Sequence, residues 1–132
     1  MMARVSRKRL LDMEDGEKQA FLQTLNMQEK DKIRWHWDVW SRPSQLAPAG
    51  AWQTWLVLAG RGFGKTRAGA EWVRHVARTR PDARIALVAS SLGEARRVMV
   101  EGESGLLAIA APGQQPHYES SLRRLTWNNG AQ

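Results

Sequence analysis

The segment from Ala59 to Thr66, AGRGFGKT, constrains the fold of this chain more than any other part. Its glycines alternate with larger residues, and a lysine and a threonine follow them. This spacing matches the P-loop pattern, except that Ala59 stands at the first glycine position. Glycines permit the tight dihedrals that let consecutive backbone N–H groups converge on one phosphate chain. The segment therefore predicts a loop that cradles a phosphate.

The residues on either side agree with this prediction. The apolar run Trp55–Ala59 is too short for a helix and predicts a strand buried on both faces. After the loop, apolar residues recur at helical spacing until about Thr79, shortly before Pro81. The loop would thus open a helix, whose N-terminal N–H groups and dipole favour an anion.

Each residue type in the loop suits one task. Lys65 would reach the β- and γ-phosphates of a bound nucleotide, and the Thr66 hydroxyl would ligate Mg²⁺. Arg61 would neutralise charge that builds up during phosphoryl transfer, so we expect Lys65 and Arg61 to act in catalysis. Arg67 could do the same or be an ordinary surface arginine. The predicted nucleotide-binding residues of this segment are Ala59, Gly60, Arg61, Gly62, Phe63, Gly64, Lys65, Thr66 and Arg67.

The chain before the loop is predicted to be helical. Residues 1–10 form a basic tail, and apolar residues recur at three- and four-residue steps from about Asp12 to Trp40. The Leu25-Asn26 pair is a possible break between two helices. Residues 41–51 contain two prolines and a glycine and predict a loop.

The chain after the loop helix alternates between strands and helices. Ile85–Ala89 predicts a second buried strand, and Ser91 with Glu94 has the spacing of a capping box that opens a helix to about Val100. Leu122–Trp127 predicts a strand, and Asn129-Gly130 is a strong hairpin signal. This order is typical of a parallel sheet with crossover helices. Because the sequence ends two residues beyond the hairpin signal, we expect the front part of a longer protein.

We therefore expect an α/β fold of the P-loop NTPase type, with a partial parallel sheet flanked by helices and an N-terminal helical extension. Residues 1–45 would hold the tail and the helical region, and residues 46–132 an incomplete ATPase core. The C-terminal part of that domain would be missing.

Composition narrows the function classes. The formal net charge is +7 with a pI of about 10.8, which favours polyanions such as nucleic acid. The absence of cysteine excludes disulfides and Cys-based metal or redox chemistry. No apolar run is long enough to cross a membrane, and the acidic residues after Leu11 interrupt any signal-like segment, so we expect a cytoplasmic protein. The seven tryptophans favour a core role over base stacking.

Four stretches of the sequence resemble one protein family, in the same order. They are WHWDVWSRPSQLAP (35–48), WLVLAGRGFGKTRAGAEWVR (55–74), RIALVASSLGEARRVMVEGESGLL (84–107) and SLRRLTWNNGA (121–131). Together they resemble the start of the ATPase domain of terminase large subunits from tailed phages and gene-transfer particles. The resemblance covers most of the chain from about residue 20.

The resemblance implies an ATP- and Mg²⁺-dependent motor that feeds double-stranded DNA into a viral capsid inside a bacterial host. It also implies a homo-oligomeric ring on a portal protein, a small terminase subunit as partner, and a nuclease domain. An arginine within the loop is typical of the family, which supports Arg61. Gln45 stands where the family has a glutamine thought to contact adenine; a polar loop residue is an equally good interpretation.

Two departures qualify the resemblance. Asn128 stands where the family pattern has proline. The chain also lacks an apolar strand ending in Asp-Glu, which a P-loop ATPase needs for Mg²⁺ and for the attacking water; Val98–Glu101 lacks the aspartate and lies in the predicted helix. We therefore expect nucleotide binding with little hydrolysis by the chain alone. Two alternatives stay open: another P-loop NTPase or kinase, and a non-catalytic basic nucleic-acid-binding module.

Overall fold

The structure is a computed structural model that describes residue 10 and residues 13–132. The chain divides into two compact units, Met1–Pro43 and Ser44–Gln132. The predicted basic tail at residues 1–10 falls outside the described residues except for Leu10, as does the predicted helix start at Asp12. In the described part of the chain, no helix has both the length and the apolar character that a membrane crossing requires.

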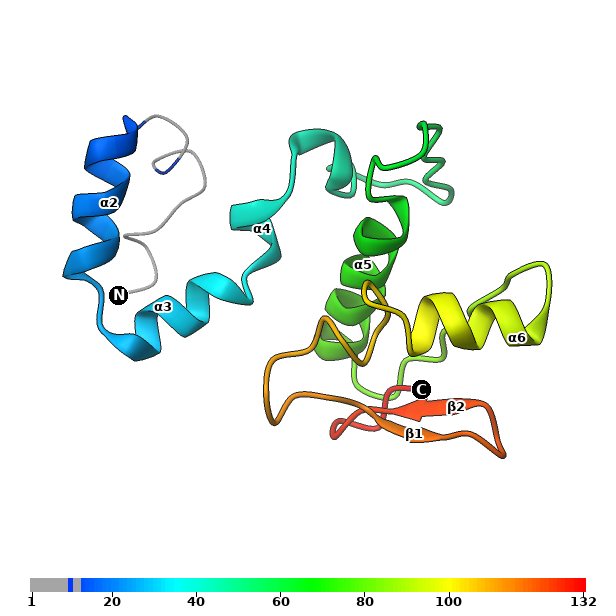
Figure 1. The fold of residues 1–132 in the computed structure, drawn as a ribbon. Helices are drawn as coiled ribbons and strands as arrows, with labels where there is room; N and C mark the ends of the chain where they lie inside the picture. Colours follow the sequence, from blue (N-terminus) through cyan, green and yellow to red (C-terminus); the bar gives the residue numbers. More distant parts are fainter. Residues whose placement is uncertain (1–9, 11–12) are drawn as a thin grey trace. The chain divides into compact units, whose positions relative to one another are not determined.

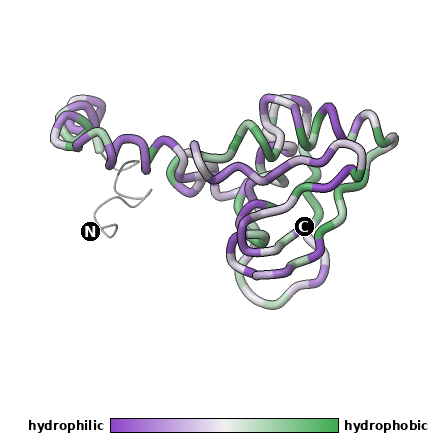
Figure 2. Tube along the Cα trace, turned by 90° about the horizontal axis from the view of Figure 1, so that it is seen from below, coloured by the Kyte–Doolittle hydropathy of each residue, from purple (hydrophilic) through white to green (hydrophobic). Residues whose placement is uncertain are grey.

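The first unit is built of short helices, α2 (Asp15–Thr24), α3 (Met27–Arg34) and α4 (Trp37–Trp40) (Figure 1). The predicted break at Leu25-Asn26 is confirmed. Asn26 caps α3: its Oδ1 accepts from the Glu29 N–H at 2.9 Å, and the Glu29 carboxylate accepts from the Asn26 N–H at 3.1 Å. Hydrophilic residues dominate the traces of α2 and α3 in Figure 2, and Ile33 is the buried residue of α3.

The second unit is organised around α5 (Lys65–Thr79). The predicted helix end at Thr79 is confirmed. Ahead of it lies the 3₁₀ turn Pro43–Gln45, which begins in the last residue of the first unit, and after it come α6 (Leu92–Glu94) and the π-helix Ala95–Val100. The Ser91 hydroxyl accepts from the Glu94 N–H at 3.1 Å, as the capping-box spacing predicts. The helix that Ser91 opens becomes a π-helix after one turn, which the sequence did not indicate.

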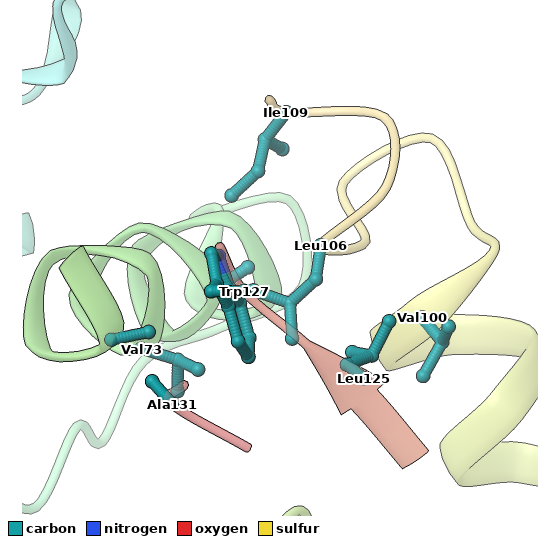
Figure 3. Close-up of a cluster of buried hydrophobic side chains, with 9 residues drawn as sticks. Val73, Val100, Leu106, Ile109, Leu125, Trp127 and Ala131 are labelled. Atoms are coloured by element: carbon teal, nitrogen blue, oxygen red, sulfur yellow. The ribbon is translucent and has the colours of Figure 1, made fainter. Parts of the chain in front are cut away.

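One hydrophobic cluster forms the core of the second unit (Figure 3). It joins the inner face of α5 to the end of the π-helix, to the turns that follow it, and to β2 and the C-terminus. Its buried residues are Ala70, Val73, Ala77, Val100, Leu106, Ile109, Leu125, Trp127 and Ala131. The expected core role of tryptophan applies to Trp127, which is 7% exposed, but Trp40 is 62% exposed.

The sheet in the described residues is an antiparallel pair, β1 (His117–Glu119) and β2 (Arg124–Thr126), with Tyr118 opposite Leu125. β2 lies inside the predicted strand Leu122–Trp127. The predicted turn at Asn129-Gly130 is present: the Gly130 N–H donates to the Trp127 carbonyl at 2.9 Å, and Gly130 has φ +89°.

After the turn, the chain pairs with residues 83–85. Gln132 N–H donates to the Ala83 carbonyl, and Ile85 N–H donates to the Gln132 carbonyl, both at 2.8 Å. Gln132 therefore bonds to the residues immediately before and after Arg84. This is the hydrogen-bond pattern of parallel strands. The residue that returns from the Asn129-Gly130 turn thus lies beside the start of the predicted strand Ile85–Ala89.

The two predicted strands, residues 55–59 and 85–89, carry no assigned secondary structure. The prediction that both are buried on both faces is wrong for this structure. Exposure alternates along each of them, and Leu56, Leu58 and Val88 are 72, 85 and 80% exposed. This alternation is that of a strand with one covered face. In the second of these segments, the partly buried Ile85 and Leu87 pack against the hydrophobic cluster.

Candidate functional site

The glycine loop, residues 59–66, is a sharp exposed bend that leads directly into α5. Gly62 and Gly64 have φ +79° and +87°, in the left-handed region that favours glycine. Gly64 is the N-cap of α5, and Lys65 is the first helical residue. Arg61, Gly62 and Lys65 are exposed. The bend therefore presents backbone and a cationic side chain to solvent at the N-terminus of a 15-residue helix.

The Lys65 ammonium closes the loop on itself. Its Nζ donates to the carbonyl oxygens of Ala59 and Gly60, both at 2.7 Å. These contacts hold the ammonium at the start of the loop. A side chain at this place can move from carbonyl oxygens to other oxygen acceptors without a change in the backbone.

Gln45, which precedes the loop in the sequence, also contacts it. The residue is 7% exposed, and its Nε2 donates to the Phe63 carbonyl at 2.9 Å. A Cβ added at Gly64 would lie 2.7 Å from the same Nε2, so the amide packs directly against the Gly64 backbone. Two adjacent residues of the loop thus touch one buried side chain.

The remaining loop residues lie where a ligand could reach them. A Cβ built at Gly60 or Gly62 would meet nothing within 4 Å, so that side of the loop is open. Thr66 is exposed in the first turn of α5. In the part of the chain that the structure describes, no three His, Asp or Glu side chains gather closely enough to hold a metal ion.

Arg67 differs from the other predicted binding residues because it forms an ion pair with Glu71. Its Nε and Nη2 contact the Glu71 Oε1 at 3.0 and 2.9 Å. The Glu71 side chain is only 2% exposed, and its Oε2 lies 3.3 Å from the Arg74 Nε. Arg74 in turn donates to the Ile109 carbonyl at 2.9 Å. The geometry therefore favours a structural role for Arg67.

Burial also affects the ionisation of Arg74. Desolvation lowers the pKa of Arg74 from its ordinary value, and nearby Glu71 opposes that shift. An arginine nevertheless stays charged at any working pH. The sequence analysis missed Glu71 and Arg74, although their spacing from Arg67, four and seven residues along a helix, places all three on one face.

Three tryptophans before and after the loop contact one another, which was not predicted from the sequence. The Trp52 ring lies 6.2 Å from Trp55 and 5.9 Å from Trp72 of α5, measured between centroids. Trp52 Nε1 donates to the Pro48 carbonyl at 2.9 Å. These contacts attach the segment before the loop to the helix after it.

Comparison with known families decides the classification. The sequence model of the family described as terminase large subunit, T4likevirus-type, N-terminal, matches residues 56–132, which is more than half of the chain. The chain belongs to this terminase large-subunit family. No curated protein and no solved structure matches it.

The family match confirms the resemblance and places this terminase chain in phage DNA packaging. The matched range includes the glycine loop from Ala59 onward, α5, and the hydrophobic cluster. It does not include Gln45.

Proposed function

We propose that this terminase chain binds the triphosphate of ATP, together with Mg²⁺, in the glycine loop, and serves the ATP-driven movement of double-stranded DNA into a capsid. The observation that carries the proposal is the exposed bend with two left-handed glycines that runs directly into the N-terminus of α5. Such a bend offers convergent N–H donors, and the helix end favours an anion.

The residues present fit a nucleotide. Lys65 would exchange the carbonyls of Ala59 and Gly60 for phosphate oxygens, since its ammonium already lies at the start of the loop. The Thr66 hydroxyl would contribute one ligand to a Mg²⁺ ion held mainly by phosphate. Arg61, exposed at the bend, would place a positive charge near the phosphates. Bound Mg²⁺ would supply charge neutralisation during phosphoryl transfer.

We also propose that residues 46–132 form an incomplete P-loop ATPase core with a partial parallel sheet. Two observations support this fold. Exposure alternates along residues 55–59 and 85–89 as it does in strands, and Gln132 pairs with Ala83 and Ile85 in the parallel pattern. Leu56, Leu58 and Val88 are exposed in the structure, although strands of such a sheet are covered on both faces.

The proposal is tested by calorimetric titration of the chain with MgATP. Replacing Lys65 with Met removes the ammonium and keeps most of the side-chain volume, so K65M should weaken binding by at least tenfold. The exposed Lys30 of α3 provides the matched control, and K30M should bind as the unaltered chain does. Equal binding by K65M and the unaltered chain would favour a basic module in which the loop has no nucleotide-binding role.

A further inference from the structure

We propose that Gln45 is a positioning residue for the glycine loop: its side-chain amide fixes the peptide between Phe63 and Gly64 so that the Gly64 N–H faces the bound phosphate. This inference rests on the proposed function. It assigns Gln45 a role toward the phosphate chain of a nucleotide, whatever base the nucleotide carries.

The Gln45 side chain contacts both residues of this peptide. Gln45 Nε2 donates to the Phe63 carbonyl at 2.9 Å, and the same nitrogen packs against the Gly64 backbone so closely that a Cβ there would lie at 2.7 Å. The residue is 7% exposed at the end of the 3₁₀ turn Pro43–Gln45.

The geometry of the peptide bond fixes the direction of the Gly64 N–H. A trans peptide is planar, and its C=O and N–H point in opposite directions. Because the Phe63 carbonyl points at Gln45, the Gly64 N–H points away from Gln45. Gly64 is the N-cap of α5, so this N–H belongs to the set of donors at the helix start that suit an anion.

Loss of the Gln45 donor would remove a hydrogen bond that favours this orientation of the peptide, so other orientations would become more populated. Gly64, at φ +87°, has no Cβ to resist such a change of orientation. Glycine therefore allows the bend, and Gln45 selects one orientation of it.

The test separates phosphate from base. The ligands are inorganic tripolyphosphate, MgATP and MgGTP, titrated into the unaltered chain and into Gln45→Met. Methionine keeps the length of the side chain and lacks the donor. Gln53→Met, at an exposed position of the same unit, is the matched control. The thermal unfolding midpoint of each variant shows whether a loss of binding follows a loss of fold.

We expect Q45M to bind tripolyphosphate and MgATP about tenfold more weakly, by a similar factor for both, with the ATP-to-GTP preference and the unfolding midpoint unchanged. The Q53M variant should match the unaltered chain. Q45M that keeps full affinity for tripolyphosphate and loses only its preference for ATP would overturn the inference, because Gln45 would then read the base. An unaltered chain that binds none of the three ligands would instead refute the proposed function.

A second measurement covers a Q45M variant that fails to fold. In the unaltered chain, the NMR signals of the Gln45 side-chain NH₂ should shift when tripolyphosphate is added, since the amide touches the loop. Signals that ignore tripolyphosphate and respond only to ATP would contradict the positioning role.

Discussion

Glu71 forms ion pairs with two arginines of α5 from an almost fully buried position. Arg67 and Arg74 contact its two carboxylate oxygens separately, and Arg74 continues to the Ile109 carbonyl. Burying a carboxylate is costly unless charges and donors compensate it, and here both do. The network therefore joins the first turns of α5 to the segment that carries Ile109 of the core.

Replacing Glu71 with Gln should destabilise the chain by about 3 kcal/mol, because two arginine contacts lose their counter-charge inside the protein. Urea unfolding of the variant measures the change. The exposed Glu103 gives the control, and E103Q should stay within about 0.5 kcal/mol of the unaltered chain. Equal stabilities for E71Q and E103Q would show that the network contributes nothing.

Replacing glycine with alanine should have opposite effects on stability at Gly64 and at Gly69. At Gly64, φ is +87° and a Cβ would collide with Gln45, so G64A should cost about 1–2 kcal/mol of stability and weaken MgATP binding. At Gly69, within α5, a Cβ meets nothing within 4 Å, so G69A should stabilise the chain by about 0.5–1 kcal/mol. Thermal unfolding and titration measure both, and a stabilising G64A would be inconsistent with the described bend.

At the scale of the element, α5 is held at both ends by groups distant in sequence. Gln45 contacts the loop that opens it, and Asn129 closes it: the Asn129 Nδ2 donates to the Ala77 carbonyl at 2.7 Å. The Asn129 Oδ1 also accepts from the Ala131 N–H at 3.3 Å. One side chain thus supports both the helix end and the turn that leads to Gln132.

Asn129→Ala should therefore destabilise the chain by about 1–2 kcal/mol, since a helix-end carbonyl and the Ala131 N–H both lose a partner. The adjacent Asn128 is exposed and is the natural control; N128A should have little effect. Circular dichroism during urea unfolding measures both variants. If N128A were the more damaging change, the capping role of Asn129 would be disproved.

Local signals predicted the elements that local residues determine. Asn26 and Ser91 cap the helices that their spacing indicates, and α5 ends at Thr79 before Pro81. Contacts between distant residues could not be predicted from the sequence, because no local pattern records which chain segments meet. The burial of Gln45, 18 residues before Phe63, and the bond from Asn129 to Ala77 across 52 residues are of this kind.

The exposure of the predicted strands also could not be derived from the sequence. Apolar composition indicated strands at 55–59 and 85–89, but exposure of each strand face depends on which other elements cover it. Leu56, Leu58 and Val88 point outward, which the residue types alone do not predict. In the loop, by contrast, the residue types sufficed: glycine at 62 and 64 predicted the bend, and both have positive φ.

At the scale of the whole molecule, the family assignment and the net charge of +7 both agree with DNA as a partner. If arginines and lysines contact DNA phosphates, binding releases counterions and weakens as salt rises. Fluorescence anisotropy with a labelled duplex should therefore show a loss of roughly tenfold or more between about 50 and 200 mM salt. Affinity that changes less than twofold over this range would argue against phosphate contacts.

The central claim is that backbone amides of the glycine loop bind a triphosphate, and amide NMR tests it most directly. Titrating the ¹⁵N-labelled chain with tripolyphosphate and with MgATP should shift the N–H signals of Gly60, Gly62, Gly64 and Lys65 more than any others, and by similar amounts for both ligands. Saturable binding of MgATP that leaves these signals in place, or shifts a different part of the chain, would contradict the account.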